Sequence, residues 1–88
     1  MSFLHTEFDG DSKNVVIVTI DHQANVMLLD EHAFRAYQSG GQFTYHGGWA
    51  SKSPVRLSPP TPGRWHVVVD LGGRAGQVRA GIRIGRAA

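Results

Sequence analysis

Residues 64–70 read Arg-Trp-His-Val-Val-Val-Asp, and this stretch decides the fold. Its three consecutive valines are stiff at χ1 and follow a tryptophan, so the run fits a largely buried pleated strand better than a helix. Prolines before the stretch cannot donate to a ladder, and Gly72-Gly73 behind it ends the run. The sequence therefore predicts a central strand over residues 64–70 whose buried face carries Trp65, Val67, Val69 and Leu71.

Residues 78–84 alternate cleanly between two kinds of side chain. Apolar side chains occupy one face and two arginines the other, which is typical of a strand with one buried face. The inward positions are Val78, Ala80, Ile82 and Ile84, and the outward ones are Arg79, Gly81 and Arg83. We expect this strand to pair with residues 64–70 through a glycine hairpin at Leu71–Gln77 that needs positive φ, so that Asp70 meets Arg79 or Arg83.

The rest of the chain reads as short strands with one inserted helix. Expected strands occupy residues 3–9, 14–21, 26–29, 42–45 and 55–57. Residues 14–21 and 26–29 are separated by a polar loop of hairpin length, so these two strands should pair. Asp30 is a candidate N-cap for a helix over residues 31–39, which Gly40-Gly41 ends. About seven strands and one short helix predict a mainly β protein, either a small antiparallel sandwich or a partly closed barrel.

Length and composition limit the classes of protein to which this chain can belong. Eighty-eight residues make a single domain over residues 1–88. The absence of cysteine excludes a disulfide framework and a thiolate zinc site. Because no apolar run is long enough for a membrane span and the first residues do not resemble a signal peptide, we expect a cytoplasmic protein without membrane contact.

The formal net charge of +2 conceals an asymmetry along the chain. Residues 1–50 contain two basic and six acidic residues, whereas residues 51–88 contain seven basic residues and one acidic residue. Either the two halves pack together and neutralise each other across strand pairs, or the arginines of the second half form a site for an anion. In the second interpretation Arg74, Arg79 and Arg83 make the site, with Arg56 or Arg64 as neighbours.

The histidines and serines do not form a recognisable catalytic or metal-binding motif. Five histidines are present, yet none has the spacing that would put two of them on one strand face or one helix face. No serine has an adjacent base. The sequence thus predicts no metal site, no cofactor and no catalytic residue, although a small enzyme that uses scattered histidines stays an alternative.

Aromatic and basic residues interleave between residues 37 and 65, as in small β-barrels that bind single-stranded nucleic acid by stacking. Against nucleic acid, the basic residues form no run and the acidic first half would repel phosphate. Trp49 follows two glycines and is either a plug at one end of the fold or an exposed contact residue for a partner.

Segments spread over nearly the whole chain resemble a family of short uncharacterised bacterial proteins that form a domain of unknown function. The segments are residues 3–9 (FLHTEFD), 24–40 (ANVMLLDEHAFRAYQSG), 53–57 (SPVRL) and 63–80 (GRWHVVVDLGGRAGQVRA). Similar domains precede TIR domains in some bacterial proteins, which implies a sensing or interaction role. The resemblance brings no catalytic positions.

Residues and resemblance together favour a non-catalytic binding module for a protein partner or a small anionic ligand. Small β domains have strand edges to protect, so self-association into a homo-oligomer is compatible with this expectation.

Overall fold

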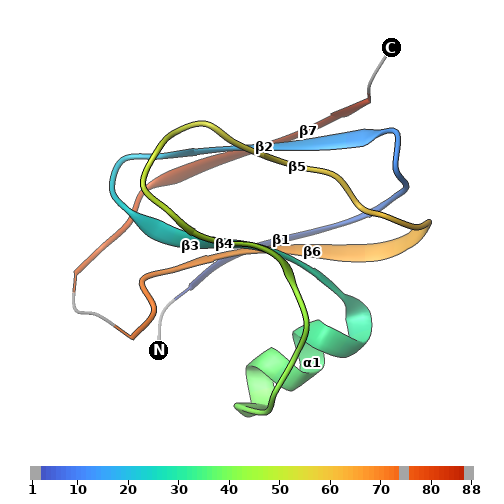
Figure 1. Ribbon diagram of the computed structural model, residues 1–88, viewed down its shortest axis with the longest axis horizontal. Helices are drawn as coiled ribbons and strands as arrows, with labels where there is room; N and C mark the ends of the chain where they lie inside the picture. The colour runs from blue at the N-terminus through green and yellow to red at the C-terminus, as the bar shows by residue number, and fades with distance from the viewer. Residues whose placement is uncertain (1–2, 74–75, 87–88) are drawn as a thin grey trace.

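A computed structural model describes residues 3–73 and 76–86 of the chain. Within these residues it forms seven strands and one helix (Figure 1). Their order is β1 (Phe3–Gly10), β2 (Asn14–Ile20), β3 (Ala24–Asp30), α1 (Glu31–Ser39), β4 (His46–Ala50), β5 (Val55–Leu57), β6 (Gly63–Asp70) and β7 (Ala80–Arg86).

The strands form two antiparallel sheets that pack face to face as a sandwich. One sheet has the strand order β1-β6-β3-β4 and the other β5-β2-β7. Figure 1 shows the second sheet above the first, with α1 below the first sheet, so the molecule has three layers. The expectation of a small antiparallel β domain with one helix is confirmed, and its sandwich form replaces the partly closed barrel.

Strand β6 is central, as its valine run predicts. It lies between β1 and β3 and pairs with both along most of its length. Val67 and Val69 are fully buried between the sheets, and Trp65 is buried beside them while its Nε1 donates to the Thr61 carbonyl at 2.9 Å. Partly buried Leu71 packs against the same core, so the predicted face of this strand is confirmed.

Two expected strand pairs do not form. Strand β2 pairs with β5 and β7, and β3 pairs with β4 and β6, so β2 and β3 belong to different sheets. Strands β6 and β7 are likewise in different sheets, and the glycine turn between them connects the sheets rather than closing a hairpin. A short connection can close a hairpin or cross from one layer to the other, because both bury an apolar face of each strand.

Two boundaries also differ from the expectation. Residues 42–45 form no strand, whereas His46–Ala50, which the double glycine made look irregular, is strand β4. Gly47 has φ +102° and approaches the Val26 carbonyl so closely that a Cβ would collide with it, which explains a glycine inside this strand. Strand β7 begins at Ala80 rather than Val78, while Ile82 and Ile84 point inward as predicted.

Helix α1 begins and ends as the sequence predicts. Asp30 Oδ1 accepts a hydrogen bond from the Ala33 amide at 2.8 Å, and Gly40 ends the helix in the left-handed conformation with φ +78°. Buried Phe34 and Ala33 pack on the outer face of the four-stranded sheet. The helix therefore covers β3 and β6 on the side away from the three-stranded sheet.

Candidate functional site

The pairing of β1 with β6 gathers two histidines and a glutamate on the outer face of the four-stranded sheet. Glu7 lies directly opposite His66, and His5 lies opposite Val68. His5 and Glu7 are two residues apart on β1 and so share a strand face. We call His5, Glu7 and His66 the histidine cluster.

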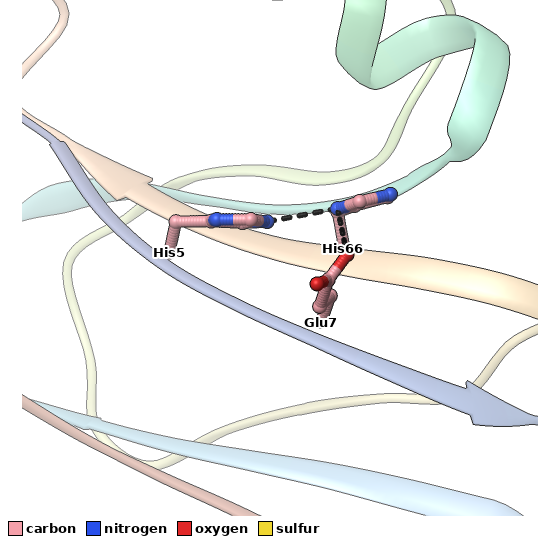
Figure 2. A group of neighbouring side chains, drawn as sticks. All are labelled: His5, Glu7 and His66. Atoms are coloured by element: carbon pink, nitrogen blue, oxygen red, sulfur yellow. Dashed lines mark hydrogen bonds and ion pairs between the residues drawn. The ribbon is translucent and has the colours of Figure 1, made fainter.

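Side chains of the histidine cluster point at one another, as Figure 2 shows. His5 Nε2 lies 2.8 Å from His66 Nδ1, and a Glu7 carboxylate oxygen lies 3.8 Å from the same His66 nitrogen. One ligand atom from each of the three side chains lies within 4.8 Å of the other two. His66 is almost completely buried, at 2% side-chain exposure, whereas Glu7 is 50% exposed.

Glu31 fixes the orientation and tautomer of His66 from the other side. Its Oε1 lies 2.9 Å from His66 Nε2, and its Oε2 accepts from Arg35 Nε at 3.2 Å. An ionised carboxylate only accepts hydrogen bonds, so His66 must donate from Nε2. In the tautomer with its single proton on Nε2, His66 has its lone pair on Nδ1, which accepts from His5 Nε2–H.

The ring of Phe34 covers both imidazoles. It stacks on His5 with centroids 4.3 Å apart and on His66 with centroids 4.2 Å apart. The two imidazole planes are within 15° of parallel, with centroids 5.0 Å apart. Since their facing nitrogens are only 2.8 Å apart, the rings meet edge to edge under one aromatic cover.

These contacts shift the ionisation of two groups. The pKa of Glu31 is lowered, chiefly because His66 donates a hydrogen bond to it. The pKa of His5 is also lowered, first by burial and then by the neighbouring His66, while Glu7 and Glu31 act in the opposite direction. The lowered pKa values favour a neutral His5 and an ionised Glu31 at neutral pH.

Arg64 belongs to this side of the molecule and not to an anion site with the other arginines. Its guanidinium lies 3.3 Å from Glu7 Oε2 and donates from Nε to Asp9 at 2.9 Å. These two carboxylates raise the pKa of Arg64. The expectation that Arg64 neighbours Arg79 and Arg83 is wrong, because β6 and β7 lie in different sheets.

Arg56 and Arg83 flank the middle strand on the outer face of the three-stranded sheet. Both lie directly opposite Ile17 of the middle strand, Arg56 from β5 and Arg83 from β7. Their neighbours in sequence pack inward, so both side chains project outward and are exposed. Within residues 3–73 and 76–86 neither guanidinium has an ion pair. We call Arg56, Ile17 and Arg83 the arginine face.

Two further arginines were expected at this anion site. Arg79 is exposed and lies just before β7, where its backbone N–H donates to Asp21 Oδ1 at 2.9 Å. In the alternation of residues 78–84 it has the same outward position as Arg83. Arg74 lies outside the described residues. The structure thus places Arg56 and Arg83 on either side of Ile17. Arg79 lies beyond them, immediately before the first residue of β7.

Asp70 does not meet Arg79 or Arg83. It is buried at 4% exposure on the outer face of the four-stranded sheet. Its carboxylate accepts hydrogen bonds from Tyr37 Oη at 2.6 Å, Asn25 Nδ2 at 3.0 Å and the Gly72 amide at 2.9 Å. Burial and this carboxylate raise the pKa of Tyr37. Asp70 therefore ties α1 and the end of β6 to the sheet.

The exposed aromatic residues lie on the side of the helix. Trp49 of β4, which is 43% exposed, is opposite Asn25 in register and donates from Nε1 to Gln23 at 3.3 Å. Tyr45, which is 49% exposed, contacts Phe43, whose ring meets Tyr37 of α1. Trp49 is thus an exposed side chain rather than an interior plug, and neither exposed aromatic is interleaved with the arginine face.

The histidine cluster could not be predicted from histidine spacing. His5 and His66 are 61 positions apart, and only the β1–β6 register brings them together. A weaker signal was present, since a histidine and a glutamate two residues apart on an expected strand share one face. His22, His32 and His46 take no part in the cluster.

Comparisons with known proteins identify a family and no activity. The model of a family described as "Domain of unknown function (DUF1883)" matches residues 1–88. No curated protein and no solved structure matches the chain. Over the residues that the structure describes, no helix has the length and apolar character that crossing a membrane requires.

Proposed function

We propose that this chain, which belongs to the DUF1883 family, is a non-catalytic interaction module that docks an acidic segment of a partner protein on its arginine face. The observation that carries the proposal is the placement of Arg56 and Arg83 on either side of Ile17, without an ion pair to any described residue.

The spacing of the two guanidinium groups suits a peptide better than a single small anion. Two strand spacings separate the backbones of Arg56 and Arg83 by about 10 Å. The half-buried Ile17 side chain lies between them. A segment with two separated carboxylates and an apolar side chain between them complements this pattern in charge and in polarity.

Nothing else in the described chain covers this face. The helix packs on β3 and β6, which belong to the other sheet, and Figure 1 shows it on the opposite side of the sandwich. Flat sheet faces that keep arginines without acidic neighbours favour external anions through both charge and the planar fork of the guanidinium. The resemblance to domains that precede TIR domains adds support for an interaction role.

The alternatives fit the geometry less well. Single-stranded nucleic acid needs stacking aromatics beside the basic residues, whereas Tyr45 and Trp49 lie on the helix side. A small enzyme would need a nucleophile or a base in a cleft. The two histidines that do meet are bonded to each other under Phe34.

The test is binding of a labelled oligoglutamate peptide, followed by fluorescence anisotropy at low and at physiological salt. We expect salt-sensitive binding that weakens about tenfold in an Arg56→Ala/Arg83→Ala variant, since each exposed ion pair contributes up to about 1 kcal/mol. The matched control is Lys13→Ala/Lys52→Ala, which removes the same charge from exposed positions elsewhere.

Equal peptide affinity for the parent and the double arginine variant would overturn the proposal. So would a parent that binds oligodeoxythymidylate in a salt-sensitive manner and ignores the peptide, because that result favours the nucleic-acid alternative.

A further inference from the structure

We infer that His5, Glu7 and His66 form a binding site for one divalent transition-metal ion of the Zn²⁺ class. This site lies on the outer face of the four-stranded sheet, on the opposite side of the sandwich from the arginine face, and does not depend on the proposed docking role. Its distinguishing feature is the convergence of two imidazole nitrogens and one carboxylate from two neighbouring strands.

The donor set fits this class of metal. Two histidines and one glutamate are the protein ligands of a well-known type of zinc site that leaves the fourth position to water. Imidazole suits Zn²⁺, Cu²⁺ and Ni²⁺, whereas Mg²⁺ and Ca²⁺ prefer sites made of oxygen atoms only. With two of three donors being nitrogen, the histidine cluster should discriminate against the hard cations.

The distances require only a small adjustment. Ligand atoms of the three side chains lie within 4.8 Å of one another. A tetrahedral ion with metal–nitrogen bonds of 2.0–2.1 Å places its two nitrogens about 3.3 Å apart. The facing nitrogens of His5 and His66 are now 2.8 Å apart because a proton lies between them. They must therefore separate by about half an ångström and tilt toward a common point.

The side chains that must move are the exposed ones. His5 and Glu7 are exposed and belong to β1, an edge strand of its sheet. Buried His66 can keep its position, because its Nδ1 already points toward the other two ligands. The proton on His5 Nε2 moves to Nδ1 of the same ring, so both imidazoles bind the ion in neutral form and keep their proton count.

The surroundings of the cluster resemble the outer shell of metal sites. Ligating histidines commonly donate their second ring N–H to a carboxylate, which orients the ring and raises its basicity. Glu31 accepts from His66 Nε2 at 2.9 Å in this manner. Phe34 stacks on both imidazoles and limits their rotation, while Arg64 holds the Glu7 carboxylate near His66. Glu31 is thus a positioning residue for the metal.

The experiment is titration of the tag-free full chain with Co²⁺ and Zn²⁺. Co²⁺ binding is followed by its visible absorption, and bound metal is counted after dialysis. We expect one ion per chain, with the strong visible bands of four-coordinate Co²⁺ that Zn²⁺ abolishes by competition. Neither Mg²⁺ nor Ca²⁺ should displace the bound Co²⁺.

Variants assign the site to these residues. His5→Ala and Glu7→Gln change exposed side chains and should each weaken binding at least tenfold, with circular dichroism confirming that the fold is kept. The matched control is His22→Ala, which removes an exposed histidine outside the cluster and should bind like the parent. Glu31→Gln should keep the stoichiometry and the spectrum but weaken binding about 10- to 100-fold.

Two results would overturn the site. One is a parent chain that binds no stoichiometric Zn²⁺ or Co²⁺. The other is binding of equal strength in the parent and in His5→Ala, which would place the metal elsewhere.

Discussion

The two sheets pack on one shared core, but their outer faces differ: one is covered by a helix and the other is exposed. Helix α1 covers the outer face of the four-stranded sheet, where His66 and Asp70 are buried and are hydrogen-bonded to neighbouring side chains. The outer face of the three-stranded sheet carries exposed Arg56 and Arg83, which form no ion pair with a described residue.

This difference follows from the cost of burying polar groups. A buried ionisable side chain destabilises the fold unless hydrogen bonds replace its water, so the helix-covered face must organise its polar residues into defined networks. An exposed arginine keeps its water and needs no internal partner. The covered face is therefore the place for a preorganised site, and the uncovered face is the place for recognition by charge.

The largest expected effect concerns the interior that both faces share. Trp65→Ala should lower the free energy of unfolding by about 3–5 kcal/mol, because it leaves a cavity between the sheets. Urea denaturation followed by circular dichroism measures this loss. Trp49→Ala, on an exposed side chain of β4, should cost clearly less. Equal losses in the two variants would mean that Trp65 is not the core residue.

The next prediction compares an inward-facing and an outward-facing residue at two adjacent positions of β7. Ile82→Asp should lower the free energy of unfolding by about 3 kcal/mol, since it places a charge against the core. Arg83→Asp at the next position should change it by less than about 0.5 kcal/mol. Thermal unfolding of both variants tests the register, and a reversed order of their midpoints would contradict it.

A smaller loss is expected on the covered face. Asp70→Ala leaves Tyr37, Asn25 and the Gly72 amide without their common acceptor, which should cost about 1–3 kcal/mol. Tyr37→Phe removes only one of the three donors and should cost less. If both variants unfold at the same denaturant concentration as the parent, the network around Asp70 does not hold α1 to the sheet.

The smallest effect concerns the edge of the uncovered sheet. The Arg79 amide donates to the Asp21 carboxylate and so holds the pKa of Asp21 below its ordinary value. A lowered folded pKa stabilises the fold above the unfolded value of about 3.9, and this contribution disappears as the pH falls through the folded pKa. An NMR titration of the Asp21 carboxyl carbon measures the pKa of Asp21 in the folded chain. A midpoint at or above the ordinary value would contradict the contact.

Most strands and the helix caps could be predicted from the sequence because they depend on neighbours in the chain, whereas β4 was hidden by its two glycines. The valine run of β6 and the Asp30 cap of α1 are local signals, and the structure confirms both. The alternation that points Arg83 outward and Ile82 inward is also local. The outward position of Arg83 could therefore be predicted, whereas the pairing of β5 and β7 with β2, which completes the arginine face, could not.

Strand pairing could not be predicted, because the same short connection fits a hairpin or a crossing between sheets. The loop after β2 looked like a hairpin loop but leads into the other layer. The expected pairing of β6 with β7 likewise misplaced Arg64. The pairing of β1 with β6, which brings His5 to His66, was not foreseen. Sites that depend on register between strands distant in sequence are invisible until the register is known.

The most direct test of the two-faced account is one pair of NMR maps. Backbone amide shifts of the ¹⁵N-labelled chain are recorded while Zn²⁺ is added and, separately, while the oligoglutamate peptide is added. We predict that Zn²⁺ shifts the amides around His5, Glu7 and His66, and that the peptide shifts those around Arg56, Ile17 and Arg83. Perturbation of the same residues by both additions would contradict a division of binding between the two faces.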